Sequence, residues 1–163
     1  MSSSYIAHSV IRYLPMSENW IYTQLAGLKH FKPLVLTKHA ENLDYFPLDS
    51  VGGVIVEAYS NIWNRVYQKL SRKWFTCHYP AYSNALKQYP VKLLHSHFAQ
   101  HGYDDIRLAK RAGLPHVVSC YGADVWRLGI TREWQEKYRQ LFSSVEGSRC
   151  SLIEGLDCAV DPS

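Results

Sequence analysis

The chain has 163 residues, 47% hydrophobic and 20% charged, which is the composition of one ordinary globular domain. Its formal charge of +4 comes without any nucleic-acid-binding motif, so nucleic acid is excluded as the expected partner. No apolar run approaches the roughly 20 residues that span a bilayer, and Met1–Tyr13 lacks the pattern of a signal peptide, so membrane contact is expected to be peripheral at most.

The spacing of the cysteines and the absence of several known sequence motifs exclude further classes of protein. Cys77, Cys120, Cys150 and Cys158 form no C-x-x-C pair and match no zinc module, which indicates a reducing, cytoplasmic compartment. Neither a dinucleotide-binding G-x-G-x-x-G nor a P-loop is present, and there is no nucleophile elbow. A nucleotide-binding protein of those types and an α/β-hydrolase are therefore disfavoured.

Short β-prone runs alternate with segments of helical periodicity along the chain. The predicted strands are Tyr5–Leu14, Pro33–Thr37, Val54–Val56, Val91–His97, His116–Tyr121 and Cys150–Ile153. The predicted helices are Trp20–His30, Asn61–Phe75, Tyr82–Tyr89, Tyr103–Ala112 and Thr131–Phe142, and Gly113 suits a helix C-cap. This alternation predicts a single α/β domain over residues 1–163, a Rossmann-like parallel sheet with helices on both faces.

Ligands of such sheets bind beyond the carboxyl ends of the strands. Three loops are expected there: Pro15–Glu18, His97–Gly102 and Tyr121–Trp126. In the first loop, Ser17 and Glu18 have two interpretations. They suit the start of a helix, as an N-cap and an acidic residue at the positive end of the helix dipole. They also suit a polar ligand, because a carboxylate accepts two hydrogen bonds from neighbouring sugar hydroxyls.

Histidines dominate the second loop and the strand before it. Alternation places His95 and His97 on one face of the strand, and His101 follows shortly after. The three could hold a metal ion, but no carboxylate or cysteine completes the set, so we expect no zinc on them. The other interpretation is that strand-end histidines form hydrogen bonds at a cleft, where His97 is nearer the strand end.

The third loop combines a tyrosine, a glycine and an aspartate. Gly122 lets a ligand approach the backbone after Tyr121, and Asp124 points across the cleft, caps the turn that follows, or does both. Outside the loops, the helix Asn61–Phe75 carries Arg65, Lys69 and Arg72 on one side. Such a helix either binds an anionic membrane weakly or packs on the sheet with a solvated face.

Four short motifs, in their order and spacing, resemble the N-terminal domain of family-4 glycosyltransferases, especially bacterial enzymes of exopolysaccharide and lipopolysaccharide assembly. They are Leu14-Pro-Met-Ser-Glu-Asn-Trp20, His95-Ser-His-Phe98, Ala112-Gly-Leu-Pro115 and Tyr121-Gly-Ala-Asp-Val125. The resemblance covers roughly residues 5–155. It implies the N-terminal, acceptor-side half of a retaining GT-B enzyme, in which a second Rossmann-like domain binds a nucleotide-sugar donor.

What the resemblance implies for this chain is specific. The residues expected to line the cleft are Ser17, Glu18, His97, Tyr121, Gly122 and Asp124. Glu18 and Asp124 would bind sugar hydroxyls, and no residue is assigned as a nucleophile. No cofactor is expected on this half, because the nucleotide-sugar belongs to a C-terminal domain of which the 163 residues carry no match. The chain is expected to be inactive without such a half, and to act on a glycan or lipid-linked acceptor.

A second hypothesis comes from a different class. The chain could be a non-catalytic α/β binding or scaffolding module that pairs with another glycosyltransferase subunit. A neighbouring reading frame that encodes a donor-binding half would favour a split enzyme.

Overall fold

The computed structural model describes residues 4–15, 18–58, 66, 79–122, 124, 131–145 and the strand at 147–150. Six strands form one parallel sheet in the order β3-β2-β1-β4-β5-β6. The strands are β1 Tyr5–Tyr13, β2 Lys32–Ala40, β3 Val54–Glu57, β4 Val91–His97, β5 His116–Cys120 and β6 Gly147–Cys150. The α-helices are α1 Trp20–Ala26, α3 Pro80–Gln88, α4 Ala99–Ala112 and α5 Arg132–Phe142, and Leu48–Val51 is a 3-10 helix.

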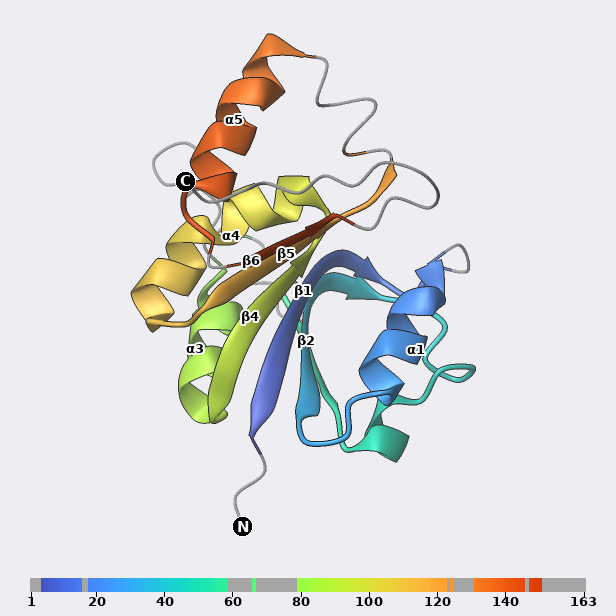
Figure 1. Cartoon of the computed structure of the whole chain (residues 1–163). Helices are drawn as coiled ribbons and strands as arrows, with labels where there is room; N and C mark the ends of the chain where they lie inside the picture. The colour runs from blue at the N-terminus through green and yellow to red at the C-terminus, as the bar shows by residue number, and fades with distance from the viewer. Residues whose placement is uncertain are drawn as a thin grey trace.

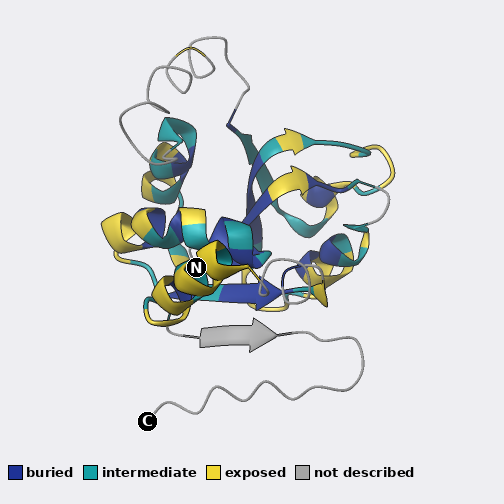
Figure 2. Cartoon of the chain, turned by 90° about the horizontal axis from the view of Figure 1, so that it is seen from above, coloured by how far each residue is buried: buried dark blue, intermediate teal, exposed yellow. Residues whose placement is uncertain are grey.

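Helices cover both faces of the sheet, which confirms the predicted Rossmann-like fold (Figure 1). On one face, α3 and α4 pack on the strands through a core that includes Leu34, Leu94 and Leu108. On the other face, α1 packs through Ile21 and Leu25 against Val10, Val35 and Leu48. A third cluster joins α5 to β5 and the start of α4 through Ala99, Val118, Cys120 and Leu141. Figure 2 shows buried residues concentrated along the sheet and exposed residues on the outer sides of the helices.

Several element boundaries differ from the sequence prediction. Helix α1 ends at Ala26, before Gly27, rather than at His30, and β2 spans Lys32–Ala40 rather than Pro33–Thr37. A further boundary differs for a physical reason that the contacts show. Helix α4 begins at Ala99 rather than Tyr103, because the Asp124 carboxylate accepts a hydrogen bond from the Ala99 N–H. The last described strand is Gly147–Cys150, whose backbone pairs with β5, and of the predicted strand Cys150–Ile153 only Cys150 lies within the described residues. The predicted C-cap is confirmed: Gly113 ends α4 in the left-handed region, with φ of 63°. The predicted helix Asn61–Phe75 lies outside the described residues, apart from Val66.

The strand order places β1 beside β4 at the centre of the sheet. From β1 the chain runs outward through β2 to β3, and from β4 it runs the other way to β6. This reversal is the topological switch point, where α/β proteins bind ligands beyond the carboxyl ends of the strands. Within the described residues, no helix combines the length and the apolarity needed to cross a membrane.

Gly102 allows α4 to lie close to β5, and from this contact we predict the effect of a side chain at Gly102 on stability. A Cβ at Gly102 would stand 2.7 Å from Val118 Cγ2 and 2.8 Å from Cγ1. Valine is stiff at χ1, so Gly102→Ala forces the helix away from the strand and should lower the free energy of unfolding by about 1–2 kcal/mol, despite the better helix propensity of alanine. Urea unfolding of the variant measures this loss. Gly122→Ala is the matched control, because a Cβ there meets nothing within 4 Å, and equal stabilities of the two variants would contradict the prediction.

Candidate functional site

Three aromatic side chains meet at the carboxyl edge of the sheet, each from a different strand-to-helix connection. Trp20 begins α1, Phe98 follows β4, and Tyr121 follows β5. The ring centroids of Trp20 and Tyr121 are 4.4 Å apart, those of Phe98 and Tyr121 4.9 Å, and those of Trp20 and Phe98 6.5 Å. All three side chains are partly exposed, so the group, called here the aromatic cluster, offers ring surface at the switch point.

The backbone is strained at the ends of the two central strands. Leu14 after β1 has φ of 65°, and Phe98 after β4 has φ of 73° with ψ of 139°. Both strained residues are held by hydrogen bonds: Asn42 Nδ2 donates to Leu14 O at 2.8 Å, and Phe98 N donates to Ser119 O at 2.8 Å. Such strain costs about 1–3 kcal/mol per residue and concentrates at functional sites. Its occurrence on neighbouring strands favours this edge as the site.

His97 is fully buried and supports the aromatic cluster rather than facing solvent. Its Nδ1 lies 2.9 Å from the Tyr121 hydroxyl, and its Nε2 lies 3.1 Å from Nδ1 of His8 on β1. Burial lowers the pKa of His97 well below its ordinary value and raises the pKa of Tyr121 to about 12. The prediction that His97 lines the cleft therefore needs correction, because the side chain that reaches the surface is Tyr121.

Asp124 is buried, and its carboxylate holds the backbone of the site. One oxygen, Oδ2, accepts hydrogen bonds from Ala99 N and Tyr121 N, each at 3.1 Å. The Tyr138 hydroxyl of α5 donates to its main-chain oxygen. Burial raises the pKa of the Asp124 carboxyl, while the two N–H donors lower it. These contacts differ from the predicted cap of the turn that follows, because the carboxylate caps the start of α4 and joins it to the loop after β5.

Glu18 and Gly122, like Tyr121, are predicted site residues that reach the surface at this edge. Glu18 is half-buried two residues before Trp20, and burial raises the pKa of its carboxyl while Arg12 opposes that shift. Gly122 is exposed next to Tyr121, with open space where a side chain would be. The structure therefore brings a carboxylate and an open stretch of backbone to the same edge as the aromatic cluster. Ser17 lies outside the described residues.

The predicted histidine trio is not the one that the fold assembles. His101 is buried on α4 with its Nε2 unpaired, and Lys38 is the charge that influences it. The histidine that joins His95 and His97 is His8, whose strand residue pairs with His95 across β1 and β4. Burial lowers the pKa of His8 to about 3.

Sequence reasoning missed His8, Trp20 and Phe98 as site residues. The available signal for His8 was a polar residue in the middle of a strand that is otherwise largely apolar. Trp20 and Phe98 are part of the quoted motifs, but their ring contacts come from loops that are distant in the chain.

A second polar network lies beneath α4. Ser96 Oγ donates to Asp105 Oδ2 at 2.8 Å and lies 2.9 Å from His116 Nε2. Burial raises the pKa of Asp105 to about 6 and lowers that of His116 to about 4. All three residues are buried between helix and sheet, so the network holds α4 in place rather than serving a ligand.

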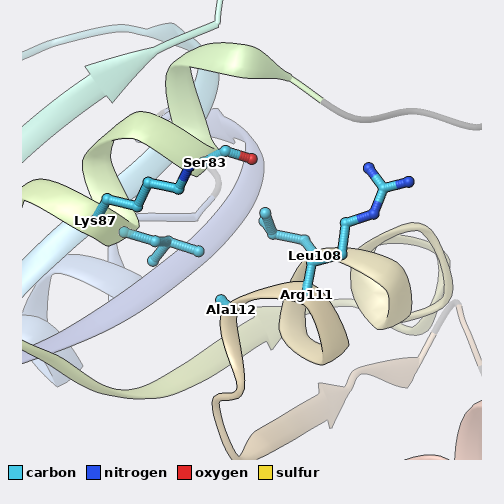
Figure 3. A pocket seen from close by; sticks show the side chains of 6 residues that line it. Ser83, Lys87, Leu108, Arg111 and Ala112 are labelled. Carbon is cyan, nitrogen blue, oxygen red and sulfur yellow. The ribbon is translucent and has the colours of Figure 1, made fainter.

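A pocket of about 340 Å³ lies between α3 and α4 (Figure 3). It is lined by Ser83, Leu86, Lys87, Leu108, Arg111 and Ala112. Arg111 and Ala112 end the helix that starts at the carboxyl end of β4, so the pocket lies toward the opposite edge of the sheet from the aromatic cluster.

Comparison with protein-family models found no match, and comparison with curated proteins found none either. Among solved structures, the chain is similar to that of Phytolacca americana UGT2 complexed with UDP-2fluoro-glucose and pterostilbene. The two are 14% identical with a TM-score of 0.47, and the match covers 75% of this chain and 31% of that chain. The present chain thus spans less than a third of that protein.

Proposed function

We propose that the chain is the acceptor-binding half of a GT-B glycosyltransferase of the retaining, family-4 type, acting in the assembly of envelope polysaccharide. The observation that carries the proposal is the meeting of Trp20, Phe98 and Tyr121 at the switch point, with the half-buried Glu18 two residues before Trp20 in the loop after β1. Aromatic faces with a nearby carboxylate suit a sugar, because the ring carbons stack on the aromatics and the hydroxyls donate to the carboxylate.

Each residue has a distinct role in this proposal. Trp20 and Tyr121 give the stacking surface, and Glu18 accepts hydrogen bonds from acceptor hydroxyls. Gly122 leaves room for the nucleotide-sugar at the exposed backbone. Asp124 and His97 act as positioning residues, because they hold the backbone and the hydroxyl of Tyr121.

The chemistry itself requires a second half. Transfer with retention has an oxocarbenium-like transition state, a leaving diphosphate to stabilise, and an acceptor hydroxyl held on the same face of the donor sugar. In the proposal the nucleotide-sugar is bound by a donor half, and this chain alone turns over no nucleotide-sugar. The acceptor is a glycan or a lipid-linked sugar held at the inner face of the membrane. The basic helix proposed for weak anionic membrane contact lies outside the described residues.

Saccharide binding tests the proposal. A panel of α- and β-linked hexose disaccharides, titrated into the protein and followed by intrinsic tryptophan fluorescence and calorimetry, should include a saturable ligand. Trp20→Ala removes a stacking face and should weaken that binding at least tenfold. Glu18→Gln exchanges charge-assisted hydrogen bonds for neutral ones and should weaken it about tenfold.

Two controls separate this site from general aromatic or acidic surface. Phe31→Ala removes an exposed aromatic at the opposite edge, just before β2, and Glu136→Gln removes an exposed carboxylate from α5. Both should bind as the unchanged protein does. Binding that is insensitive to Trp20→Ala would refute the assignment. Failure of the whole panel to bind would favour the non-catalytic scaffolding module instead.

A further inference from the structure

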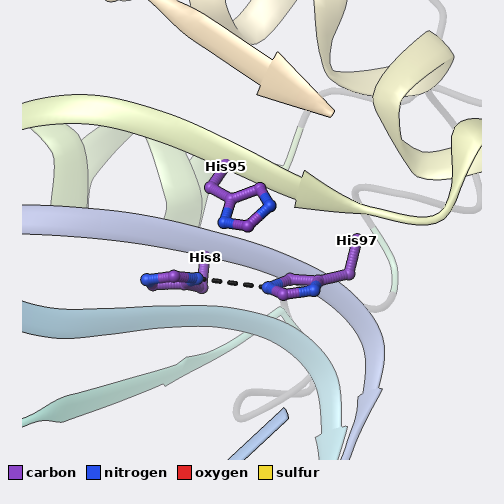
Figure 4. Close-up of side chains that lie close together, drawn as sticks. All are labelled: His8, His95 and His97. Carbon is purple, nitrogen blue, oxygen red and sulfur yellow. Dashed lines mark hydrogen bonds between the residues drawn. The ribbon is translucent and has the colours of Figure 1, made fainter. Parts of the chain in front are cut away.

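Three histidines converge between the two central strands of the sheet. His8 projects from β1, and His95 and His97 project from β4 toward it (Figure 4). One ring nitrogen from each lies within 4.8 Å of the other two, and His8 Nδ1 is 3.1 Å from His97 Nε2. His8 and His97 are buried, while His95 is partly exposed.

If the three rings only filled the core, this arrangement would lower the stability of the fold. The hydrogen bond between His8 and His97 uses one nitrogen of His8, and the other, Nε2, is buried without a partner. An unpaired buried polar atom is destabilising, and three apolar side chains would fill the same space without one. What favours a shared ligand is the other nitrogen, because His8 Nδ1 and His97 Nε2 stand close enough to bind one ion.

The geometry points to a site for a divalent cation of the zinc class, with His8, His95 and His97 as its three protein ligands. Two nitrogens bound at 2.0–2.1 Å to a tetrahedral ion lie about 3.3 Å apart, close to the separation between His8 and His97. The ligand nitrogen of His95 lies within 4.8 Å of the other two, and it moves closer to complete the set. Three imidazoles without carboxylate suit zinc, cobalt or nickel rather than magnesium or calcium.

The surroundings of two rings are those of metal-binding histidines. His95 Nε2 lies 2.8 Å from Ser119 Oγ, and His97 Nδ1 lies 2.9 Å from the Tyr121 hydroxyl. A ligating histidine commonly has its second ring nitrogen held by a hydrogen bond, which fixes the tautomer and the ring orientation. The bond to Tyr121 leaves Nε2 of His97 directed at Nδ1 of His8, where the ion binds. The partly exposed side of His95 gives the ion a way in.

An ion bound by the three histidines affects the aromatic cluster through Tyr121. With Nε2 of His97 bound to the ion, Nδ1 carries the proton and donates to the Tyr121 hydroxyl. The ion thereby holds one ring of the aromatic cluster in a single orientation. The metal site does not rest on the proposed glycosyltransferase function, because none of its ligands contacts a sugar, and its one link to that function is the bond of His97 to Tyr121.

The test uses the full chain stripped with EDTA and then given Zn²⁺ alone. Calorimetry and elemental analysis should find one zinc per chain, and the Tm should rise by roughly 5–10 °C when free zinc exceeds the Kd a hundredfold. Co²⁺ should give the intense visible absorption of a tetrahedral ion. His95→Asn should weaken zinc binding at least a hundredfold. Ser119→Ala, which loosens the His95 ring, should weaken it about tenfold.

His101→Asn is the matched control, since His101 is buried nearby but lies outside the cluster, and it should bind zinc as the unchanged protein does. If His95→Asn fails to fold, the cobalt spectrum of the unchanged protein still decides the question. A protein that binds no zinc tighter than about 100 µM, or gives only an octahedral cobalt spectrum, overturns the proposal. So does a folded His95→Asn variant that keeps full affinity.

Discussion

Metal-free protein should lose at least about 3 kcal/mol of its free energy of unfolding when the pH falls from 7.5 to 5.0. His101 and His116 are buried in their neutral forms, with pKa values lowered to about 3 and about 4. In the unfolded chain both titrate near 6.5. Between these values the unfolded state binds more protons than the folded state, so the stability that both give above pH 6.5 is lost as the pH falls.

The magnitude follows from the same shifts. At pH 5 each histidine is about 1.5 pH units below its unfolded pKa, which corresponds to about 2 kcal/mol for each. Asp105 opposes them, because burial raises the pKa of its carboxyl to about 6 and its ionised form is unfavourable in the fold. As the pH falls from 6 to 5, about 1.4 kcal/mol is recovered from Asp105. These three groups give a net loss of about 3 kcal/mol, and His8 and His97 add to it, because burial lowers their pKa values as well.

The charged groups that influence these residues do not reverse the sign. Lys38 further lowers the pKa of His101, and His95 further lowers that of His116. Urea unfolding in EDTA at pH 7.5, 6.0 and 5.0 measures the loss. His101→Gln removes one titrating group and should reduce the change by about 2 kcal/mol, whereas His30→Gln, at an exposed position, should leave it unaltered. Equal stability at pH 7.5 and 5.0 would show that these histidines are not buried as neutral rings.

Asp124→Ala should lower the free energy of unfolding by about 2–5 kcal/mol. The carboxylate accepts from the N–H groups of Ala99 and Tyr121, and its removal leaves two donors without a partner. Asp124→Asn keeps one acceptor oxygen and should cost about 1 kcal/mol. Urea unfolding measures both losses, and hydrogen exchange should be faster at the Ala99 and Tyr121 amides in the alanine variant.

Asp44→Ala, at an exposed acidic residue, is the control and should match the unchanged protein. The experiment also separates the two interpretations of Asp124. A carboxylate that holds the backbone affects stability first, and sugar binding falls only as the Tyr121 loop is disturbed. A variant with full stability and no sugar binding would instead show that the carboxylate contacts the ligand.

Part of this site can be predicted from sequence because the signals are local. The alternation of apolar runs and helical periodicity is a property of neighbouring residues, so it predicts the strands and the ligand-binding edge of the sheet. The glycine that ends α4 and the loops that follow β1, β4 and β5 are visible for the same reason. Glu18, Tyr121 and Gly122 were found because each stands in one of those loops.

The remaining features depend on which strands become neighbours, and local pattern carries no information about that. His8 and His97 are 89 positions apart in the chain, and they meet only because β1 and β4 pair. The Asp124 cap on Ala99 spans 25 positions and requires β4 and β5 to lie side by side. Backbone pairing likewise sets the last strand, Gly147–Cys150, since parallel strands form through non-local hydrogen bonds. The sequence by itself determined the α/β alternation and the edge at which a ligand would bind; the tertiary structure alone decided that Asp124 is a cap, that His97 is buried, and that His8 completes a cluster of three histidines.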